Sequence, residues 1–236
     1  MPGKKKAAKA VAPKPDAAKK DRKRIAAKPT PAKAKKPKAG KLSKAPRPAM
    51  AEKEQLLSSV VVFQGPLFRV LHDKLIEPGG RKSERDVIRH NGSVVILAID
   101  SSKNKKDPWI VVERQYRHAA RQFLWELPAG KLDPGESALA GAQRELAEET
   151  GYSAKKWKLL TEYYPSPGFL GESMKVFVAQ GLVAGDTNWD DDEQIELRLV
   201  KLSELLKMIE KGAILDGKTL TGALLYARRL APKRRK

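Results

Sequence analysis

The stretch GKLDPGESALAGAQRELAEETGY, residues 130–152, combines the signals of a helix with a cluster of acidic side chains. Ser137 is a residue type that caps helix N-termini, and Gly151 stands where a glycine commonly ends a helix. Apolar residues recur between them at helical spacing and predict the buried face of that helix: Leu139, Ala142 and Leu146.

Three glutamates of the predicted helix are expected on one face. Glu145, Glu148 and Glu149 are spaced i, i+3 and i+4, which brings like charges together and destabilises a bare helix. Divalent cations would neutralise the cluster, and an all-oxygen ligand set favours Mg²⁺ or Mn²⁺. Arg144 projects about 100° away from Glu145, so we expect it to pair with Glu136 and fix the preceding loop. The alternative is a solvated, Glu-rich helix face.

The same residues resemble the Nudix box, G-x5-E-x7-R-E-U-x-E-E-x-G-U, where U is apolar or aromatic. Gly130 and Glu136 match its first fixed positions, and RELAEETGY (144–152) matches the remainder, so all four glutamates of the box are present. Seven fixed identities at fixed spacing make a strong motif. The resemblance implies the Nudix α/β/α sandwich with a mixed sheet, plus a small N-terminal antiparallel sheet.

The flanks resemble the ADP-ribose pyrophosphatase branch of that superfamily. The branch has an aromatic–Arg element and an ELPAG-like element before the box, represented here by QYR (115–117) and ELPAG (126–130). It also carries a proline beyond the box, and Pro167 follows Tyr152 by 15 residues. The resemblance extends over about residues 55–230.

The resemblance implies roles for individual residues. Metal ligands are expected from one backbone carbonyl and three carboxylates: Ala129, Glu145, Glu148 and Glu149. Glu148 and Arg144 also belong to the expected catalytic set. Arg117 and Glu126 match positions near the substrate diphosphate and terminal ribose, and Pro167 is the third expected substrate-binding residue.

A further glutamate, in a loop beyond the box, acts in the family as a base or positions the attacking water. The matching stretch is DDDEQIE (190–196), in which we select Glu193 because it lies just before the strand expected at Ile195. Glu196, Asp192 and Asp191 remain rivals. An ordinary solvated acidic loop is the alternative interpretation.

The implied reaction is Mg²⁺-dependent hydrolysis of ADP-ribose, or a related ADP-sugar, to AMP and ribose 5-phosphate. Alternative substrates are another nucleoside-diphosphate sugar such as GDP-mannose, NADH, or a nucleotide cap on RNA. The family also implies a homodimer that exchanges the small N-terminal sheet and stacks adenine between aromatic side chains. The sequence leaves several candidates for adenine stacking open: Phe63, Phe68 and Trp189. Three arginines are candidate phosphate clamps: Arg89, Arg114 and Arg121.

Outside the box, strand-like and helical segments alternate in a pattern that predicts an α/β protein. Strands are expected at 60–70, 85–92, 93–100, 109–117, 122–127, 157–164, 173–182 and 195–202. Helices are expected at 202–212 and 220–230. We therefore expect four regions: a disordered Lys/Ala/Pro-rich tail (1–50), a small dimerisation sheet (51–92), a Nudix domain (93–227) and a basic C-terminal tail (228–236).

Charge is concentrated at the two ends of the chain. Residues 1–50 carry a net charge of +16 and residues 228–236 a net charge of +6, whereas residues 51–227 carry −2. The N-terminal segment is similar in composition to histone-like tails and predicts non-specific binding of nucleic acid or another polyanion by counterion release. Nucleic-acid association through these tails is thus a second functional hypothesis. A solubilising tail, or a true start at Met50, is the alternative.

Composition excludes several classes of protein. The chain has no cysteine, which excludes disulfides, Cys-ligated zinc, iron–sulfur clusters and thiol nucleophiles. Neither an apolar run of about 18–20 residues nor a signal-peptide core is present, so no membrane partner is expected. We expect a cytoplasmic protein, with the basic tails favouring association with a nucleoid or nucleus.

Overall fold

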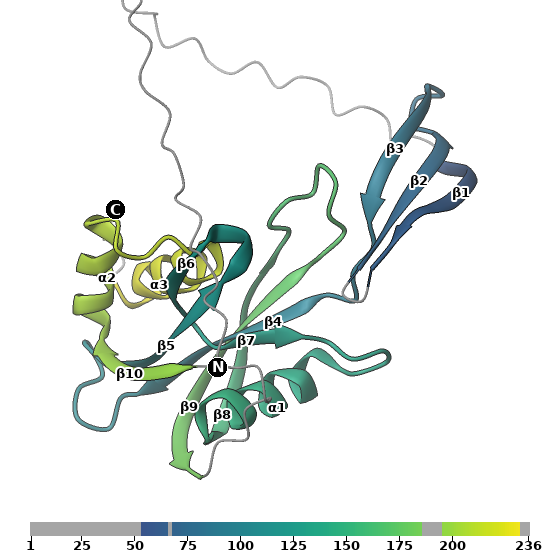
Figure 1. Ribbon diagram of the computed structural model, residues 1–236. Coiled ribbons are helices and arrows are strands. Elements are labelled where there is room, and N and C mark those ends of the chain that lie inside the picture. Colours follow the sequence, from purple (N-terminus) through teal and green to yellow (C-terminus); the bar gives the residue numbers. More distant parts are fainter. Residues whose placement is uncertain (1–52, 66–67, 186–194, 232–236) are drawn as a thin grey trace, which may run out of the picture. The chain divides into compact units, whose positions relative to one another are not determined.

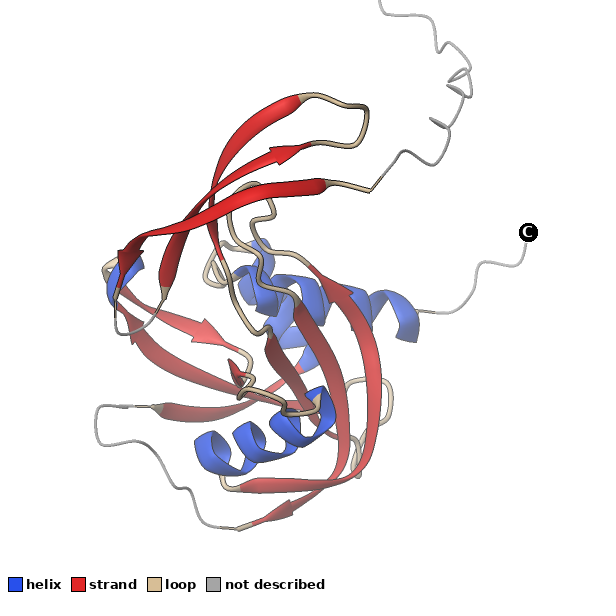
Figure 2. Ribbon diagram, turned by 90° about the vertical axis from the view of Figure 1, so that its right-hand side faces the viewer, coloured by secondary structure: helices blue, strands red, loops and turns tan. Residues whose placement is uncertain are grey.

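The computed structural model describes residues 53–65, 68–185 and 195–231. These residues form a three-stranded sheet followed by a larger sheet that carries helices on both faces (Figures 1 and 2). The expected α/β/α sandwich and small antiparallel sheet are confirmed. Outside the described residues lie the expected tail 1–50, the stacking candidate Trp189, the loop residues Asp191, Asp192 and Glu193, and residues 232–236 of the basic C-terminal tail.

The small sheet is a meander of β1 (Gln55–Gln64), β2 (Arg69–Ile76) and β3 (Lys82–Ile88). The β2–β3 turn uses Gly79 and Gly80, whose φ angles of 97° and 85° suit glycine. Strand β1 is an edge strand and is exposed along its whole length. Neither face of β1 is therefore buried against the described part of the chain.

The large sheet has seven strands, with the central order β10-β5-β4-β9-β8. Two short strands extend it, because β6 pairs with β5 and β7 pairs with β4. Strands β4 and β9 run parallel and the other pairs are antiparallel, which makes the sheet mixed. The bounds are β4 (Ser93–Asp100), β5 (Trp109–Arg117), β6 (Gln122–Glu126), β7 (Ala129–Lys131), β8 (Tyr152–Tyr163), β9 (Met174–Ala184) and β10 (Glu196–Lys201).

Strand β4 lies at the centre and supplies both cores. Its alternate residues Val94 and Ile96 pack in the cluster with α1 (Ala138–Thr150), and Val95 and Leu97 pack in the opposite cluster. All four are fully buried, as a central strand with helices on both faces requires. The opposite cluster is covered by α2 (Leu202–Glu210) and α3 (Gly217–Leu230) (Figure 2).

Helix α1 begins and ends as its sequence predicts. The Ser137 hydroxyl accepts a hydrogen bond from the Ala140 N–H at 3.2 Å, and Gly151 ends the helix at φ 69°. The prediction that Leu139 belongs to the buried face is wrong, because this side chain is 43% exposed. Gly141 lies against the core instead, where an added Cβ would come within 2.6 Å of Leu132 Cδ2.

Several boundaries differ from the sequence prediction. The single strand expected at 60–70 is split between β1 and β2, strand β8 begins at Tyr152 rather than at residue 157, and α3 begins at Gly217 rather than at 220. Helix α3 ends at Leu230 as predicted, and Arg228 and Arg229 form its last turn, where cations complement the helix dipole. The Arg229 guanidinium donates to the Leu160 carbonyl at 2.6 Å.

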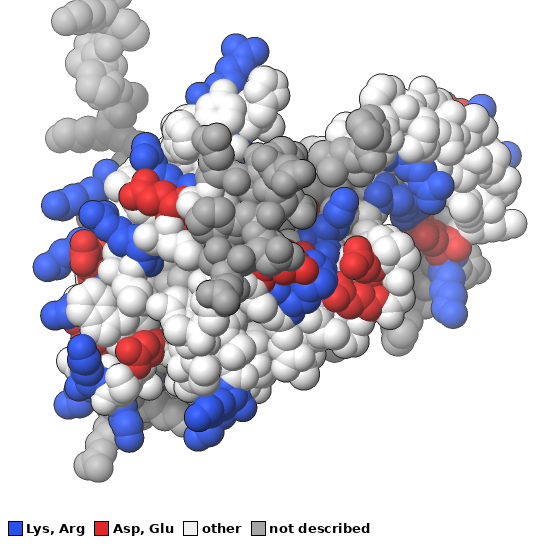
Figure 3. All heavy atoms as spheres, turned by 60° about the horizontal axis from the view of Figure 1, so that its bottom comes forward, with Lys and Arg blue, Asp and Glu red and all other residues white. Residues whose placement is uncertain are grey.

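The described surface mixes both signs of charge on the face drawn in Figure 3, in keeping with the near-neutral charge of residues 51–227. Among the described residues, no helix is both long and apolar enough to cross a membrane.

Candidate active site

Arg144 joins the loop before α1 to the acidic face of the helix. Its Nε and Nη2 donate to the two carboxylate oxygens of Glu136 at 3.1 and 3.0 Å, and Nη2 also donates to the Lys131 carbonyl. Its Nη1 donates to Glu145 at 2.8 Å and to Glu148 at 2.9 Å. The expected Arg144–Glu136 pair is therefore present, and it holds the pKa of Glu136 below its usual value.

The pairing also fixes the loop. The Glu136 carboxylate accepts a hydrogen bond from the Asp133 N–H at 3.1 Å, so both ends of this acid are engaged. Glu136, followed by Glu145 and Glu148, raises the pKa of the Arg144 guanidinium further above its already high value. Arg144 thus stays charged and orients two glutamates of the box.

Glu145 and Glu149 point from α1 toward strand β7. A Cβ added at Gly130 would lie 1.9 Å from Glu145 Cδ, so the carboxylate occupies space that only glycine leaves open. The Glu149 carboxylate accepts a hydrogen bond from the Ala129 N–H at 2.9 Å. The side chains of Glu145 and Glu149 are both largely buried, and Glu145 is 12% exposed. The Glu148 side chain is 39% exposed. The structure therefore brings Glu145 and Glu149 to the Ala129–Gly130 backbone.

A buried cationic–anionic cluster lies beside this point. Arg117 from β5 donates through Nε and Nη2 to the two oxygens of Glu126 at 3.0 and 2.8 Å, in a bidentate pair. Glu126 is only 1% exposed, and Lys218 from α3 also contacts its Oε2. Glu126 raises the pKa of Arg117, with smaller contributions of the same sign from Glu113 and Glu149. Arg117 therefore lies within the electrostatic reach of the helix glutamates.

Two residues in this region were not predicted from the sequence. Glu113 is fully buried on β5 and is the register partner of Glu126 on β6, so their side chains share one face of the sheet. Glu113 lies four residues before Arg117 on the same strand, so both side chains point to one face of the sheet. This spacing was the signal in the sequence that could have identified Glu113. Lys218 is 8% exposed and gave no such signal, because its partner lies 92 residues away in sequence.

The other residues predicted for the site lie outside the contacts described above. Pro167 lies exposed in the loop between β8 and β9. Glu196, a rival for the loop acid, is on β10 and contacts Arg114 at 3.4 Å. Arg121 adopts a left-handed backbone, φ 54°, at the end of the short 3₁₀ turn His118–Ala120.

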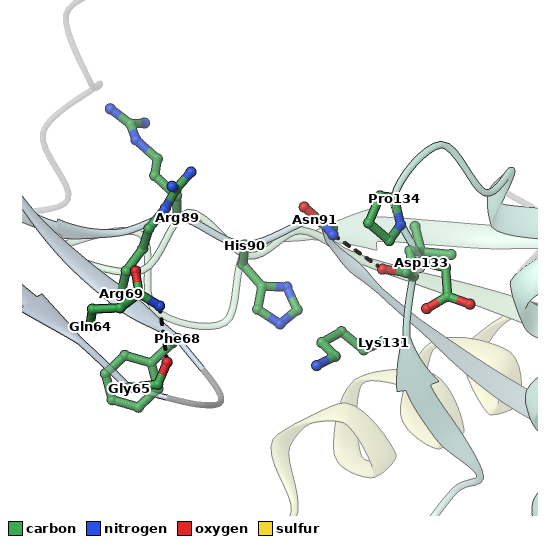
Figure 4. A pocket seen from close by; sticks show the side chains of 11 residues that line it. Gln64, Gly65, Phe68, Arg69, Arg89, His90, Asn91, Lys131, Asp133 and Pro134 are labelled. Carbon is green, nitrogen blue, oxygen red and sulfur yellow. Dashed lines mark hydrogen bonds between the residues drawn. The ribbon is translucent and has the colours of Figure 1, made fainter. Parts of the chain in front are cut away.

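A basic pocket of about 460 Å³ lies between the small sheet and the loop that precedes α1. Figure 4 shows the His90 ring and the Lys131 ammonium group turned toward the same space. Arg89, also in the lining, is held by Asp73 at 2.7 Å. Phe68 lines the pocket and contacts Phe63, with ring centroids 5.8 Å apart. Cations beside an aromatic ring suit a ligand that combines negative charge with a flat base.

Comparison with known proteins identifies similar chains. The family model of the NUDIX domain matches residues 89–221. An ADP-ribose pyrophosphatase from Bacillus subtilis is 36% identical over 70% of this chain and 88% of its own length. A methanol dehydrogenase activator from Bacillus methanolicus is 36% identical over 71% of this chain and 89% of its own. An ADP-ribose pyrophosphatase from Mycobacterium tuberculosis is 34% identical over 74% and 84%.

A solved structure has the same fold. The crystal structure of an ADP compounds hydrolase superposes with a TM-score of 0.66, covering 77% of this chain and 96% of that chain at 22% identity. This likeness concerns the fold.

Proposed function

The chain belongs to the NUDIX domain family, and on that premise we propose that it hydrolyses the diphosphate of ADP-ribose, or of a related ADP-sugar, to AMP and ribose 5-phosphate. The observation that carries the proposal is the meeting of Glu145 and Glu149 with the Ala129–Gly130 backbone, beside the Arg117–Glu126 pair. Carboxylates of the kind that bind a cation thus lie beside a guanidinium of the kind that binds phosphate, and this supports the proposal.

The family uses divalent metals, and the donor set here fits one. Within the described ranges, no three acidic or histidine side chains are gathered into a ready-made metal cage. The donors are nevertheless all oxygens, and Gly130 provides a cradle for the Glu145 carboxylate that a Cβ would fill. We assign Mg²⁺, with Mn²⁺ as the alternative, to Glu145, Glu149, Glu148 and the Ala129 carbonyl. Held by these residues, a divalent ion would supply positive charge that neutralises the diphosphate and the leaving phosphate.

Arg117 is suited to bind the diphosphate. Glu126 engages its Nε and Nη2, and the side chain is 38% exposed, so the guanidinium is accessible to a ligand. Arg144, by contrast, directs its donors to protein acceptors, so its part in the catalytic set is to hold Glu145 and Glu148. Glu126 fixes Arg117 and faces the terminal ribose, and Pro167 shapes the far side of the substrate.

Glu193 is proposed to orient the attacking water or accept its proton. The support is its place in the acidic run 190–196, immediately before β10, which pairs with the Arg117-bearing strand β5. Glu193→Gln is expected to lower kcat about 100-fold or more, whereas Asp191→Asn and Asp192→Asn leave it nearly unchanged. A larger loss in either aspartate variant would transfer the role to that residue.

The nucleoside end of the substrate is proposed to bind near Phe63 and Phe68, with Arg89 and His90 nearby. The fold also supports a homodimer formed through the small sheet. Strand β1 is an edge strand that exposes a row of large apolar side chains: Leu56, Leu57, Val60, Val61, Val62 and Phe63. Such an edge and patch are typical of interaction surfaces.

The dimer proposal is tested by sedimentation equilibrium. Val61→Asp, at a position 46% exposed on β1, is expected to give monomers. Val183→Asp is the matched control, because Val183 is 44% exposed on β9, outside the small sheet. A monomeric wild-type chain, or equal dissociation in both variants, would contradict the proposal.

The substrate is tested by comparing kcat/KM across a panel. ADP-ribose is expected to be hydrolysed with the highest kcat/KM, above GDP-mannose, NADH and capped RNA. A higher value for GDP-mannose or for the cap would keep the hydrolase assignment and overturn the choice of substrate.

A second proposal is association with nucleic acid through the basic ends, which would also favour a nucleoid or nuclear location. Its support is the sequence alone: residues 1–50 carry +16 and residues 228–236 carry +6. Binding to DNA or RNA should weaken steeply with salt, and a chain lacking residues 1–47 should lose most of the affinity and the salt slope. Equal affinity and slope with and without that segment would reject it.

A further inference from the structure

Lys218 is a buried lysine that contacts the Glu126 carboxylate. The same carboxylate holds Arg117. The Lys218 side chain is 9% exposed, and Lys is almost never this buried unless it is paired. Its ammonium group contacts Glu126 Oε2 and lies 3.2 Å from Asp216 Oδ1. With Arg117 the cluster has two cations and two anions.

Glu126 is shared between its two cations in a defined way. Oε1 accepts from Arg117 Nε at 3.0 Å, whereas Oε2 accepts from both Arg117 Nη2 and Lys218. The two parallel bonds align the planes of the guanidinium and the carboxylate. Lys218 adds a third bond to Oε2, and a carboxylate held at three points cannot turn about its Cγ–Cδ bond without losing one of them.

Lys218 is placed by contacts that do not involve its own charge. The Asp216 carboxylate caps α3 by accepting from the Thr219 N–H at 2.9 Å, and the Thr219 hydroxyl accepts from the Leu127 N–H at 2.8 Å. Helix α3 also packs closely on Leu127, because a Cβ at Gly222 would lie 2.9 Å from Leu127 Cδ1. The start of α3 therefore stays against residues 126 and 127 when the Lys218 side chain is changed.

We propose that Lys218 is a positioning residue for substrate binding: by holding Glu126 Oε2 it fixes the direction in which Arg117 presents its guanidinium to the substrate. The inference rests on the proposed function of Arg117 as a diphosphate ligand. Lys218 itself touches no reacting atom, so its loss should weaken binding and leave the chemical step nearly unchanged. The effect should appear in KM rather than in kcat.

The test compares Lys218→Met with Lys218→Arg in the full chain, with Lys211→Met as the matched control. Lys211 is an exposed lysine after α2, so the control removes the same charge away from Glu126. Steady-state hydrolysis of ADP-ribose is expected to show KM raised about tenfold or more in Lys218→Met, with kcat within about threefold. Lys218→Arg should recover most of the loss, because it restores a cation to Glu126, and Lys211→Met should match wild type.

A second readout does not depend on turnover. The Arg117 Nε–H resonance in a ¹H–¹⁵N spectrum, assigned by its absence in Arg117→Lys, should be slow to exchange in the wild type and faster in Lys218→Met. Absence of ADP-ribose hydrolysis in the folded wild type would refute the proposed function, and the exchange rate would still test the Lys218 contact. If Lys218→Met unfolds, Lys218→Gln replaces it in both measurements.

Three results would overturn the inference. The first is a KM in the Met or Gln variant equal to that of Lys211→Met, with unchanged Arg117 exchange. The second is a loss confined to kcat. The third is a Lys218→Arg variant that recovers the thermal midpoint but not KM, which would assign Lys218 a purely structural role.

Discussion

Gly130→Ala is the substitution that the geometry of the site predicts most sharply. A Cβ at residue 130 would lie 1.9 Å from Glu145 Cδ and 2.0 and 2.1 Å from its two oxygens. Ordinary van der Waals contact begins at 3.4 Å, so the carboxylate must move by about 1.5 Å. Because the obstacle is the end of a flexible side chain and not backbone, the chain can still fold around the added methyl group.

We expect the Gly130→Ala substitution to lower kcat far more than it lowers the free energy of unfolding. A displacement of about 1 Å in a catalytic constellation costs about 100-fold in rate, which corresponds to about 2.7 kcal/mol in the activation free energy. We therefore expect kcat for ADP-ribose to fall by at least about 100-fold. The free energy of unfolding should change by no more than about 1 kcal/mol, because alanine restricts the unfolded chain more than glycine does.

The assay measures kcat and the thermal midpoint in parallel. Gly217→Ala is the control, because a Cβ there meets no atom within 4 Å, and it should retain wild-type activity. A Gly130→Ala protein with wild-type kcat and an intact fold would show that the position of the Glu145 carboxylate does not matter for turnover, and it would refute the reasoning.

Three further predictions concern the helix and its neighbours. Glu149→Gln should abolish most ADP-ribose turnover while circular dichroism stays unchanged; near-wild-type activity would remove Glu149 from the metal site. Ser137→Ala should lower the free energy of unfolding by about 1 kcal/mol through loss of the cap of α1, measured by urea denaturation; an unchanged midpoint would contradict it. Burial raises the pKa of Glu126, but Arg117 and Lys218 outweigh it and the net pKa lies below the ordinary glutamate value of 4.5. The ion pairs therefore stabilise the fold above that value and lose their contribution as pH falls through the lowered pKa. Glu126→Gln should cost about 3 kcal/mol at pH 7 and progressively less below pH 4.5, as measured by unfolding across pH; a constant difference would contradict the assignment.

Local signals were enough for the helix of the box and the central strands. Ser137 and Gly151 mark the ends of α1 because capping depends on a few neighbouring atoms. Strands β4 and β5 match the runs 93–100 and 109–117, because a buried central strand needs apolar side chains on both faces.

Features that depend on distant parts of the chain were not accessible in this way. Leu139 has helical spacing with Leu146 but lies on the first turn, where the described structure leaves it exposed. Helix α3 begins before its apolar run because Asp216 caps it and Thr219 reaches Leu127. From the sequence, Lys218 is expected at the surface, because its partner Glu126 lies 92 residues away and becomes a neighbour only in the folded chain.

The site shows the same division. Spacing alone placed Arg144 beside Glu136, because both residues belong to one local loop and helix. The pairing of Arg117 with Glu126 follows from the β5–β6 register, and the approach of Glu149 to Ala129 follows from packing α1 on the sheet. The resemblance to the family suggested the candidate site residues, and the fold showed which of them are in contact.

The most direct test of the central claim is hydrolysis of ADP-ribose by the purified full chain, with and without Mg²⁺, followed by quantifying AMP and ribose 5-phosphate. Equal amounts of AMP and ribose 5-phosphate are expected with Mg²⁺, and almost no product is expected after chelation of the metal. A folded protein that releases neither product, or that releases ADP and ribose instead, would contradict the central claim.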